Sequence, residues 1–166
     1  MPERDFIVEK KRITYEGIFS FAKLYQLIDQ YFENLGYDKV EQKNVEVVQP
    51  EGKYVEVEME PYKSIADWAK QRIHLRIICS NLKEVDIKRD GKTERLSQGK
   101  VQIVIDAWLE TDTMTMWEEK PIYYILRQIF HKYAFPPATR HFKANIAGDV
   151  GRMVDEVKAF LNLYKF

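Results

Sequence analysis

The side chains best suited to chemistry are the three histidines and the single cysteine. His74 lies between Arg72 and Arg76 in an alternating charged segment, where a bound cation would face two like charges. None of the histidines belongs to a metal-binding spacing such as H-E-x-x-H, so we expect no metal site. Cys79 follows two isoleucines, and this apolar setting predicts a buried, unreactive thiol.

The carboxylates follow the pattern of a solvated sheet face. Asp106 and Glu110 share one face of a strand but lie four residues apart, about 13 Å at ~3.3 Å per residue, too far for a glycosidase pair. Nucleotide-binding loops and nucleophile elbows do not occur in the sequence. We therefore expect no catalytic residues and no cofactor. Cross-strand ion pairs are predicted among Glu56, Glu58, Glu60, Lys70, Arg72 and Arg76.

Composition and charge narrow the class of protein. The 166 residues include 26 Lys and Arg and 26 Asp and Glu, giving a formal net charge of zero. Nucleic-acid binders usually carry a basic excess, so we do not expect nucleic acid as a partner. The N-terminal residues are charged, unlike a signal peptide, and no apolar run approaches the ~18 residues of a membrane span. These features predict a single cytoplasmic domain, residues 1–166.

The elements that must position these side chains begin with one clear helix and a series of strands. From residue 17 to 35 apolar residues recur at helical spacing, with Ser20 or Gly17 as the start and Gly36 after the last turn. Between residues 38 and 113 the period changes to two, which predicts antiparallel strands with one buried face. Turns are predicted at Pro50-Glu51-Gly52, at Asn81 and at Asp90-Gly91.

Two further helices are predicted near the C-terminus. The first runs from Pro121 to Ala134, ends at Pro136-Pro137, and has an inner stripe of Ile122, Leu126, Ile129 and Tyr133. The last helix reaches Tyr164 and buries Ile146, Val150, Met153, Val157, Phe160 and Leu161. Its start has two interpretations: Asp149 caps it, or it extends back to Phe142.

The order of these elements predicts an α+β fold, with helices packed on one face of a curved antiparallel sheet of about six strands. This order loosely resembles the helix-grip arrangement of the START and Bet v 1 superfamily, in which a curved sheet wraps a long terminal helix. The resemblance implies a carrier or sensor of a small apolar ligand held between sheet and C-terminal helix. Candidate lining residues for such a cavity are the small residues Ala144, Gly148 and Gly151.

The region around the predicted C-terminal helices has more aromatic residues than one core stripe uses. Aromatic side chains beside Arg and Lys are typical of protein interfaces. We therefore predict a non-enzymatic binding or assembly module that docks a protein partner or self-associates here, with a peripheral membrane surface as a further candidate. The candidate interface comprises Tyr123, Tyr124, Arg127, His131, Lys132, Phe135 and Arg140.

Overall fold

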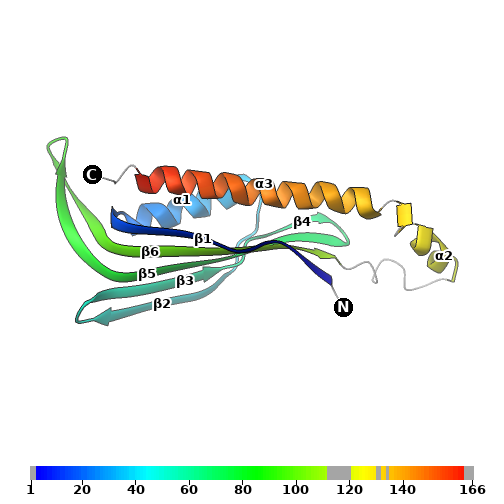
Figure 1. The fold of residues 1–166 in the computed structure, drawn as a ribbon, viewed down its shortest axis with the longest axis horizontal. Coiled ribbons are helices and arrows are strands. Elements are labelled where there is room, and N and C mark those ends of the chain that lie inside the picture. Colours follow the sequence, from blue (N-terminus) through cyan, green and yellow to red (C-terminus); the bar gives the residue numbers. More distant parts are fainter. Residues whose placement is uncertain (1–2, 112–120, 130–131, 134, 163–166) are drawn as a thin grey trace.

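The chain forms an open, curved antiparallel sheet with two of its helices along one face (Figure 1). The computed structural model describes residues 3–111, 121–129, 132–133 and 135–162. The strands are β1 (Glu3–Phe19), β2 (Glu41–Gln49), β3 (Gly52–Met59), β4 (Tyr62–Ala66), β5 (Ala69–Arg89) and β6 (Lys92–Thr111). The helices are α1 (Phe21–Asn34), α2 (Pro121–Ile129) and α3 (Phe135–Asn162). The predicted α+β class and antiparallel sheet are confirmed.

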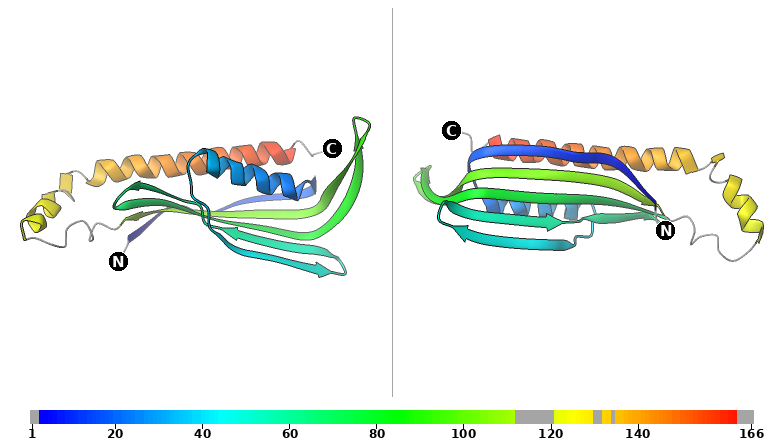
Figure 2. Two further views of the ribbon diagram at one scale, coloured as in Figure 1. Left: turned by 180° about the vertical axis from the view of Figure 1, so that it is seen from behind. Right: turned by 60° about the horizontal axis from the view of Figure 1, so that its bottom comes forward.

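The sheet is built around one long hairpin. The strand order is β1-β6-β5-β3-β2, β4 pairs with β5, and every pair is antiparallel. Strands β5 and β6 contain 21 and 20 residues. Asp90 and Gly91 close the hairpin with φ values of 52° and 76°, the left-handed values of a type I′ turn, so the predicted turn is confirmed. The closed end curls toward the side that bears the helices (Figures 1 and 2).

Asn81 is the site of a β-bulge, and the predicted turn at this position is wrong. Strand β5 continues through it, while its pairing with β6 shifts register between Ser80 and Lys83. The φ of Asn81 is 55°, a left-handed value that asparagine tolerates better than most residues. Because an extra residue bends the strand that contains it, a residue with turn propensity marks the bend of a continuous strand.

Helix α1 has the ends that its sequence predicts. The Ser20 hydroxyl accepts a hydrogen bond from the backbone N–H of Lys23 at 3.3 Å, which makes Ser20 the N-cap. Gly36 follows the last turn with a φ of 79°. The N–H of Tyr37 donates to the carbonyl of Phe32, an arrangement that satisfies the otherwise free carbonyls of the last turn.

The hydrophobic core lies between the concave sheet face, α1 and α3 (Figure 2). Alternate residues of β5 and β6 point inward, and the helices contribute one buried stripe each. Cys79 is fully buried, and burial raises the pKa of its thiol to about 12, which confirms the predicted buried cysteine. The core includes Leu24, Ile28 and Phe32 of α1, Ile73, Leu75 and Ile77 of β5, and Ile146, Val150, Met153 and Val157 of α3.

Helix α3 starts at Phe135, earlier than either predicted start. Asp149 therefore lies in the helix interior and does not cap it. Pro136 and Pro137 lie in the first turn of α3, where a missing N–H leaves no intrahelical bond unmade. They were predicted to end the preceding helix, but α2 already ends at Ile129.

Candidate docking site

Helix α2 presents four apolar side chains on one face. Ile122, Ile125, Leu126 and Ile129 occupy positions i, i+3, i+4 and i+7, which share one side of a helix. All four are exposed, from 45% for Leu126 to 63% for Ile122. We call these four residues the α2 stripe.

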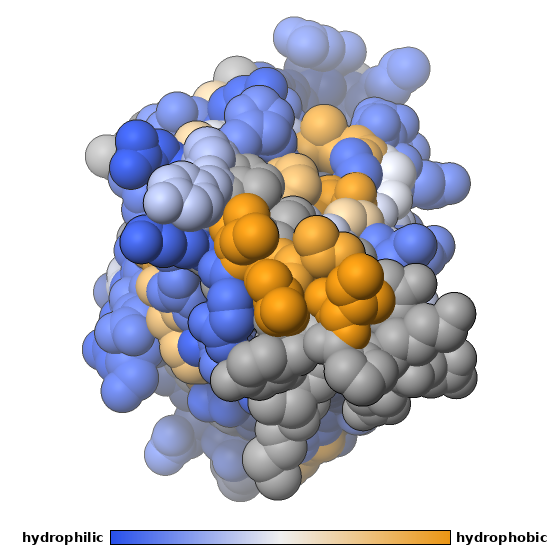
Figure 3. Space-filling view, turned by 90° about the vertical axis from the view of Figure 1, so that its right-hand side faces the viewer, coloured by the Kyte–Doolittle hydropathy of each residue, from blue (hydrophilic) through white to orange (hydrophobic). Residues whose placement is uncertain are grey.

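The α2 stripe is uncovered because α2 projects beyond the end of the sheet (Figures 1 and 2). The helix does not pack closely on any described strand or helix. Viewed from this end, the molecule shows a cluster of apolar side chains at its surface (Figure 3). The prediction that Ile122, Leu126, Ile129 and Tyr133 face inward is wrong, since all four are exposed. Periodicity indicates an apolar face, and tertiary packing decides what covers it.

The predicted interface residues that the structure describes belong to α2, to residues 132–133 or to the start of α3. Lys132 and Arg140 are exposed, and the Lys132 ammonium lies 5.4 Å from the centre of the Tyr133 ring. His131 lies outside the described residues. The same holds for the side chains of four further predicted residues, whose backbone belongs to α2 or to the first turn of α3: Tyr123, Tyr124, Arg127 and Phe135.

A buried polar cluster fixes α3 to the rest of the molecule. Oδ2 of Asp149 lies 2.8 Å from the Tyr37 hydroxyl, which is also 3.0 Å from Oε1 of Gln71 on β5. Arg152 donates to Oδ1 of Asp149 at 2.7 Å, and the Tyr31 hydroxyl donates to the backbone carbonyl of Asp149 at 2.6 Å. Burial is the main cause that raises the pKa of Tyr37 well above its usual range, and the hydrogen bond to Asp149 is the second cause. The middle of α3 is therefore tied to both α1 and β5.

Sequence reasoning missed this cluster, although one signal for it was present. Asp149 lies three residues after Ile146 and four before Met153, so it interrupts the apolar stripe of α3 near its buried side. A carboxylate in such a position needs buried hydrogen-bond donors. The sequence indicates the need for donors, but only the fold shows that Tyr37 and Arg152 supply them.

The small-residue stripe predicted to line a cavity faces away from the sheet. Ala144 and Gly148 are exposed, and Gly151 is partly exposed. A Cβ added at either glycine would meet no atom within 4 Å. The buried face of α3, with Ile146 and Val150, points in the opposite direction. These three small residues therefore line no space between α3 and the sheet.

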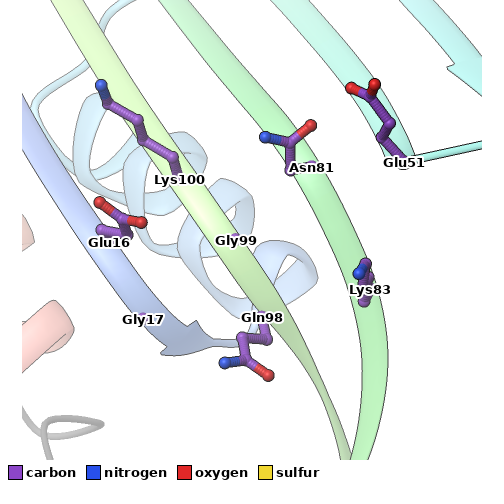
Figure 4. A pocket seen from close by; sticks show the side chains of 8 residues that line it. All are labelled: Glu16, Gly17, Glu51, Asn81, Lys83, Gln98, Gly99 and Lys100. Carbon is purple, nitrogen blue, oxygen red and sulfur yellow. The ribbon is translucent and has the colours of Figure 1, made fainter. Parts of the chain in front are cut away.

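A surface depression of about 440 Å³ lies at the bend of the sheet, on the face opposite α1 (Figure 4). Its charged side chains are two acids and two bases: Glu16, Glu51, Lys83 and Lys100. Gly99 also lines the depression, and a Cβ at this position would come within 2.8 Å of the Ser80 carbonyl oxygen. The balanced charges favour neither an anion nor a cation, and the glycine is explained by the bend.

The outer sheet face contains the predicted cross-strand ion pairs. Arg72 lies 2.8 Å from Glu60, and Arg76 lies 3.0 Å from Glu58. His74 shares Glu58 with Arg76, and its Nε2 is 2.9 Å from the carboxylate. Lys70 has no such ion pair within the described residues. Apart from Lys70, each of these charges has a partner across the sheet, so these residues act as a structural ladder.

Two further observations concern metals and membranes. No group of three or more potential metal ligands lies together in the part of the chain that the structure describes. Among the described helices, none combines the length and apolar character that crossing a bilayer requires.

Comparisons of the chain with family models, curated proteins and solved structures give no significant match. The helix-grip resemblance therefore rests on the order of elements alone. Within the described residues, the feature that indicates a function most directly is the α2 stripe.

Proposed function

We propose that this protein is a non-enzymatic binding module that docks a protein partner through α2. The observation that carries the proposal is the α2 stripe, four large apolar side chains exposed on a helix that does not pack closely on the rest of the described structure. Fully burying one such side chain contributes about 1.5–3 kcal/mol, and partly exposed ones proportionally less. A partner that covers the α2 stripe would therefore stabilise the bound complex by burying these side chains.

The spacing of the stripe favours a groove on a protein as the partner surface. Amphipathic helices that bind in apolar grooves use anchor residues at positions i, i+3, i+4 and i+7. Ile122, Ile125, Leu126 and Ile129 match all four positions. The helix is nine residues long, about 13 Å at ~1.5 Å per residue, a length that suits a local groove.

Charge favours a different protein over a second copy of α2. The sequence from residue 121 to 148 contains no Asp or Glu, although the whole chain contains 26. It contains four cationic residues, Arg127, Lys132, Arg140 and Lys143. Two copies of this segment would bring like charges together, whereas a groove with an acidic rim would complement them. We therefore assign acidic residues to the rim of the partner's groove.

The two alternative partners have less support. A membrane-surface helix needs a strongly charged polar face, and α2 contains a single Arg and no Lys. A small apolar ligand between sheet and α3 was suggested by Ala144, Gly148 and Gly151, which face away from that space. No observation in the described part of the chain favours either alternative over docking through α2.

The test compares capture of partners by the protein and by two aspartate variants. Ile125→Asp places a charge in the α2 stripe, and Val40→Asp places one at a similarly exposed valine outside it. We expect a protein from native-cell lysate to be retained by wild type and by Val40→Asp, lost with Ile125→Asp, and released by salt. The same protein should be retained less well by Arg127→Glu.

Two outcomes would contradict the proposal. One is that every captured protein binds Ile125→Asp as well as it binds wild type. The other is flotation of the wild-type protein with phosphatidylserine vesicles at low salt, prevented by Ile125→Asp, which would assign α2 to a membrane surface. Thermal unfolding of both aspartate variants checks that they remain folded.

A further inference from the structure

Strand β2 leaves one backbone edge of the sheet free. It is the last strand in the order β1-β6-β5-β3-β2, and its only described strand partner is β3. Figures 1 and 2 show no described element along its outer side. Its pairing with β3 is regular from Lys43 to Gln49, and this stretch includes three valines and no Gly or Pro. A regular free edge of this kind is a template for another strand.

The opposite edge of the sheet is interrupted along its length, whereas β2 is regular from Lys43 to Gln49. Strand β1 shifts register twice against β6, between Phe6 and Val8 and between Val8 and Lys11. Lys10 has a left-handed φ of 46°, and its N–H donates to the Asp106 carboxylate at 2.8 Å. Bulges and lysines at an edge oppose pairing with a further strand. By contrast, the only irregularity of β2 lies between Glu41 and Lys43, at its start.

The long polar side chains of β2 also leave its edge open. The Lys43 ammonium lies 3.2 Å from Glu56, and the Glu46 carboxylate lies 2.5 Å from Lys53, both partners being on β3. The Gln42 amide donates to Glu60, just after β3, at 2.7 Å. These side chains reach toward β3 and so do not block the free edge of β2. Val47 and Val48 are exposed, the latter at 81%.

We propose that β2 pairs antiparallel with β2 of a second copy, about a two-fold axis at Val45. A two-fold axis perpendicular to the sheet places the inner faces of both copies on the same side. Directly opposite residues must then have side chains on the same face, so their two residue numbers are both odd or both even and add up to an even number. Centring on Val45 gives a sum of 90 and aligns all nine residues from Glu41 to Gln49 with their counterparts. In this register no like charges are directly opposite, because Lys43 faces Val47 and Glu46 faces Asn44.

This dimer would join two sheets into one and carry two copies of α2. Strand β2 and α2 lie in different parts of the molecule (Figure 1), so pairing through β2 leaves the α2 stripe accessible. Two docking helices on one particle would bind a partner with paired grooves more tightly than one helix does. The β2 inference stands on the sheet edge alone and does not require the proposed function of α2.

Disulfide trapping tests the register directly. The native Cys79 is buried, so a cysteine introduced at the surface is the only accessible thiol among the described residues. Directly opposite residues in an antiparallel pair have Cα atoms about 4.5–5.5 Å apart, within disulfide range. We expect Val45→Cys to form a covalent dimer under mild oxidation at least tenfold faster than Val48→Cys. The two Val48 positions would lie about 20 Å apart, six residues along the strands.

Analytical ultracentrifugation completes the test. We expect wild-type protein and Ile125→Asp to dimerise, and Val45→Lys to lose at least tenfold in association because it places like charges side by side. Val45→Lys should fold normally, since Val45 is opposite Glu56 on β3. A monomer at all accessible concentrations, equal trapping at both cysteine positions, or a dimer abolished by Ile125→Asp would each overturn the proposal. Only the last of these would implicate α2 in self-association.

Discussion

The Tyr37 hydroxyl lies 2.8 Å from Oδ2 of Asp149 and joins the segment after α1 to the middle of α3. Tyr37 is 5% exposed and Asp149 is 9% exposed, so water does not readily replace this contact. A carboxylate in this position is stable only while donors surround it. The contact therefore makes the position of α3 depend on the region that follows α1.

Removing the Tyr37 hydroxyl should destabilise the fold. We expect Tyr37→Phe to lower the free energy of unfolding by about 1–3 kcal/mol, because a buried carboxylate loses a donor. Urea denaturation measures this change. Tyr54→Phe is the matched control, since its hydroxyl contacts Glu56 on the outer face of the sheet, and we expect less than about 0.5 kcal/mol there. Equal losses in both variants would show that Asp149 does not need Tyr37.

Alkaline pH should destabilise the protein through Cys79. Burial raises the pKa of this thiol from 9.0 to about 12, so between these values the folded protein keeps a proton that the unfolded chain releases. The stabilising contribution is complete below pH 9 and is lost as pH rises toward 12. Between pH 8 and pH 10 the loss should be about 1.4 kcal/mol, measured by urea denaturation. Cys79→Ala should lack this component of the slope; an unchanged slope would contradict the assignment.

Two glycines should respond in opposite ways to the same substitution. Gly99→Ala would place a Cβ 2.8 Å from the Ser80 carbonyl oxygen, and we expect a loss of about 1–3 kcal/mol. Gly148→Ala adds a Cβ in open space within α3, so we expect a gain of about 0.5–1 kcal/mol. Thermal unfolding of both variants measures the difference. A loss at Gly148 would mean that α3 needs a small residue there after all.

The α2 stripe should contribute little to the stability of the isolated protein. We expect Ile129→Ala to change the free energy of unfolding by less than about 0.5 kcal/mol, because Ile129 is exposed. Ile146→Ala, at a fully buried position of α3, should cost about 2–5 kcal/mol. Chemical denaturation of both variants provides the comparison. A large loss from Ile129→Ala would indicate that the rest of the chain covers α2 in solution.

Local sequence predicted the elements whose signals need no distant partner. Ser20 and Gly36 mark the ends of α1 because capping involves neighbouring residues only. The alternating residues of β5 predicted a buried face and a charged face, since the side-chain period of a strand is two. At Asn81 the same local signal was ambiguous, because a left-handed residue serves a turn or a bulge equally well.

The sequence by itself determined that the chain has an α+β fold, that α2 is amphipathic, and that acidic and basic residues share one sheet face. Only the tertiary structure decided that the α2 stripe faces outward and that Asp149 meets Tyr37. Periodicity and capping are properties of neighbouring residues. Burial depends instead on which segments meet in the fold: α3 packs on the sheet, whereas α2 lies beyond the end of the sheet.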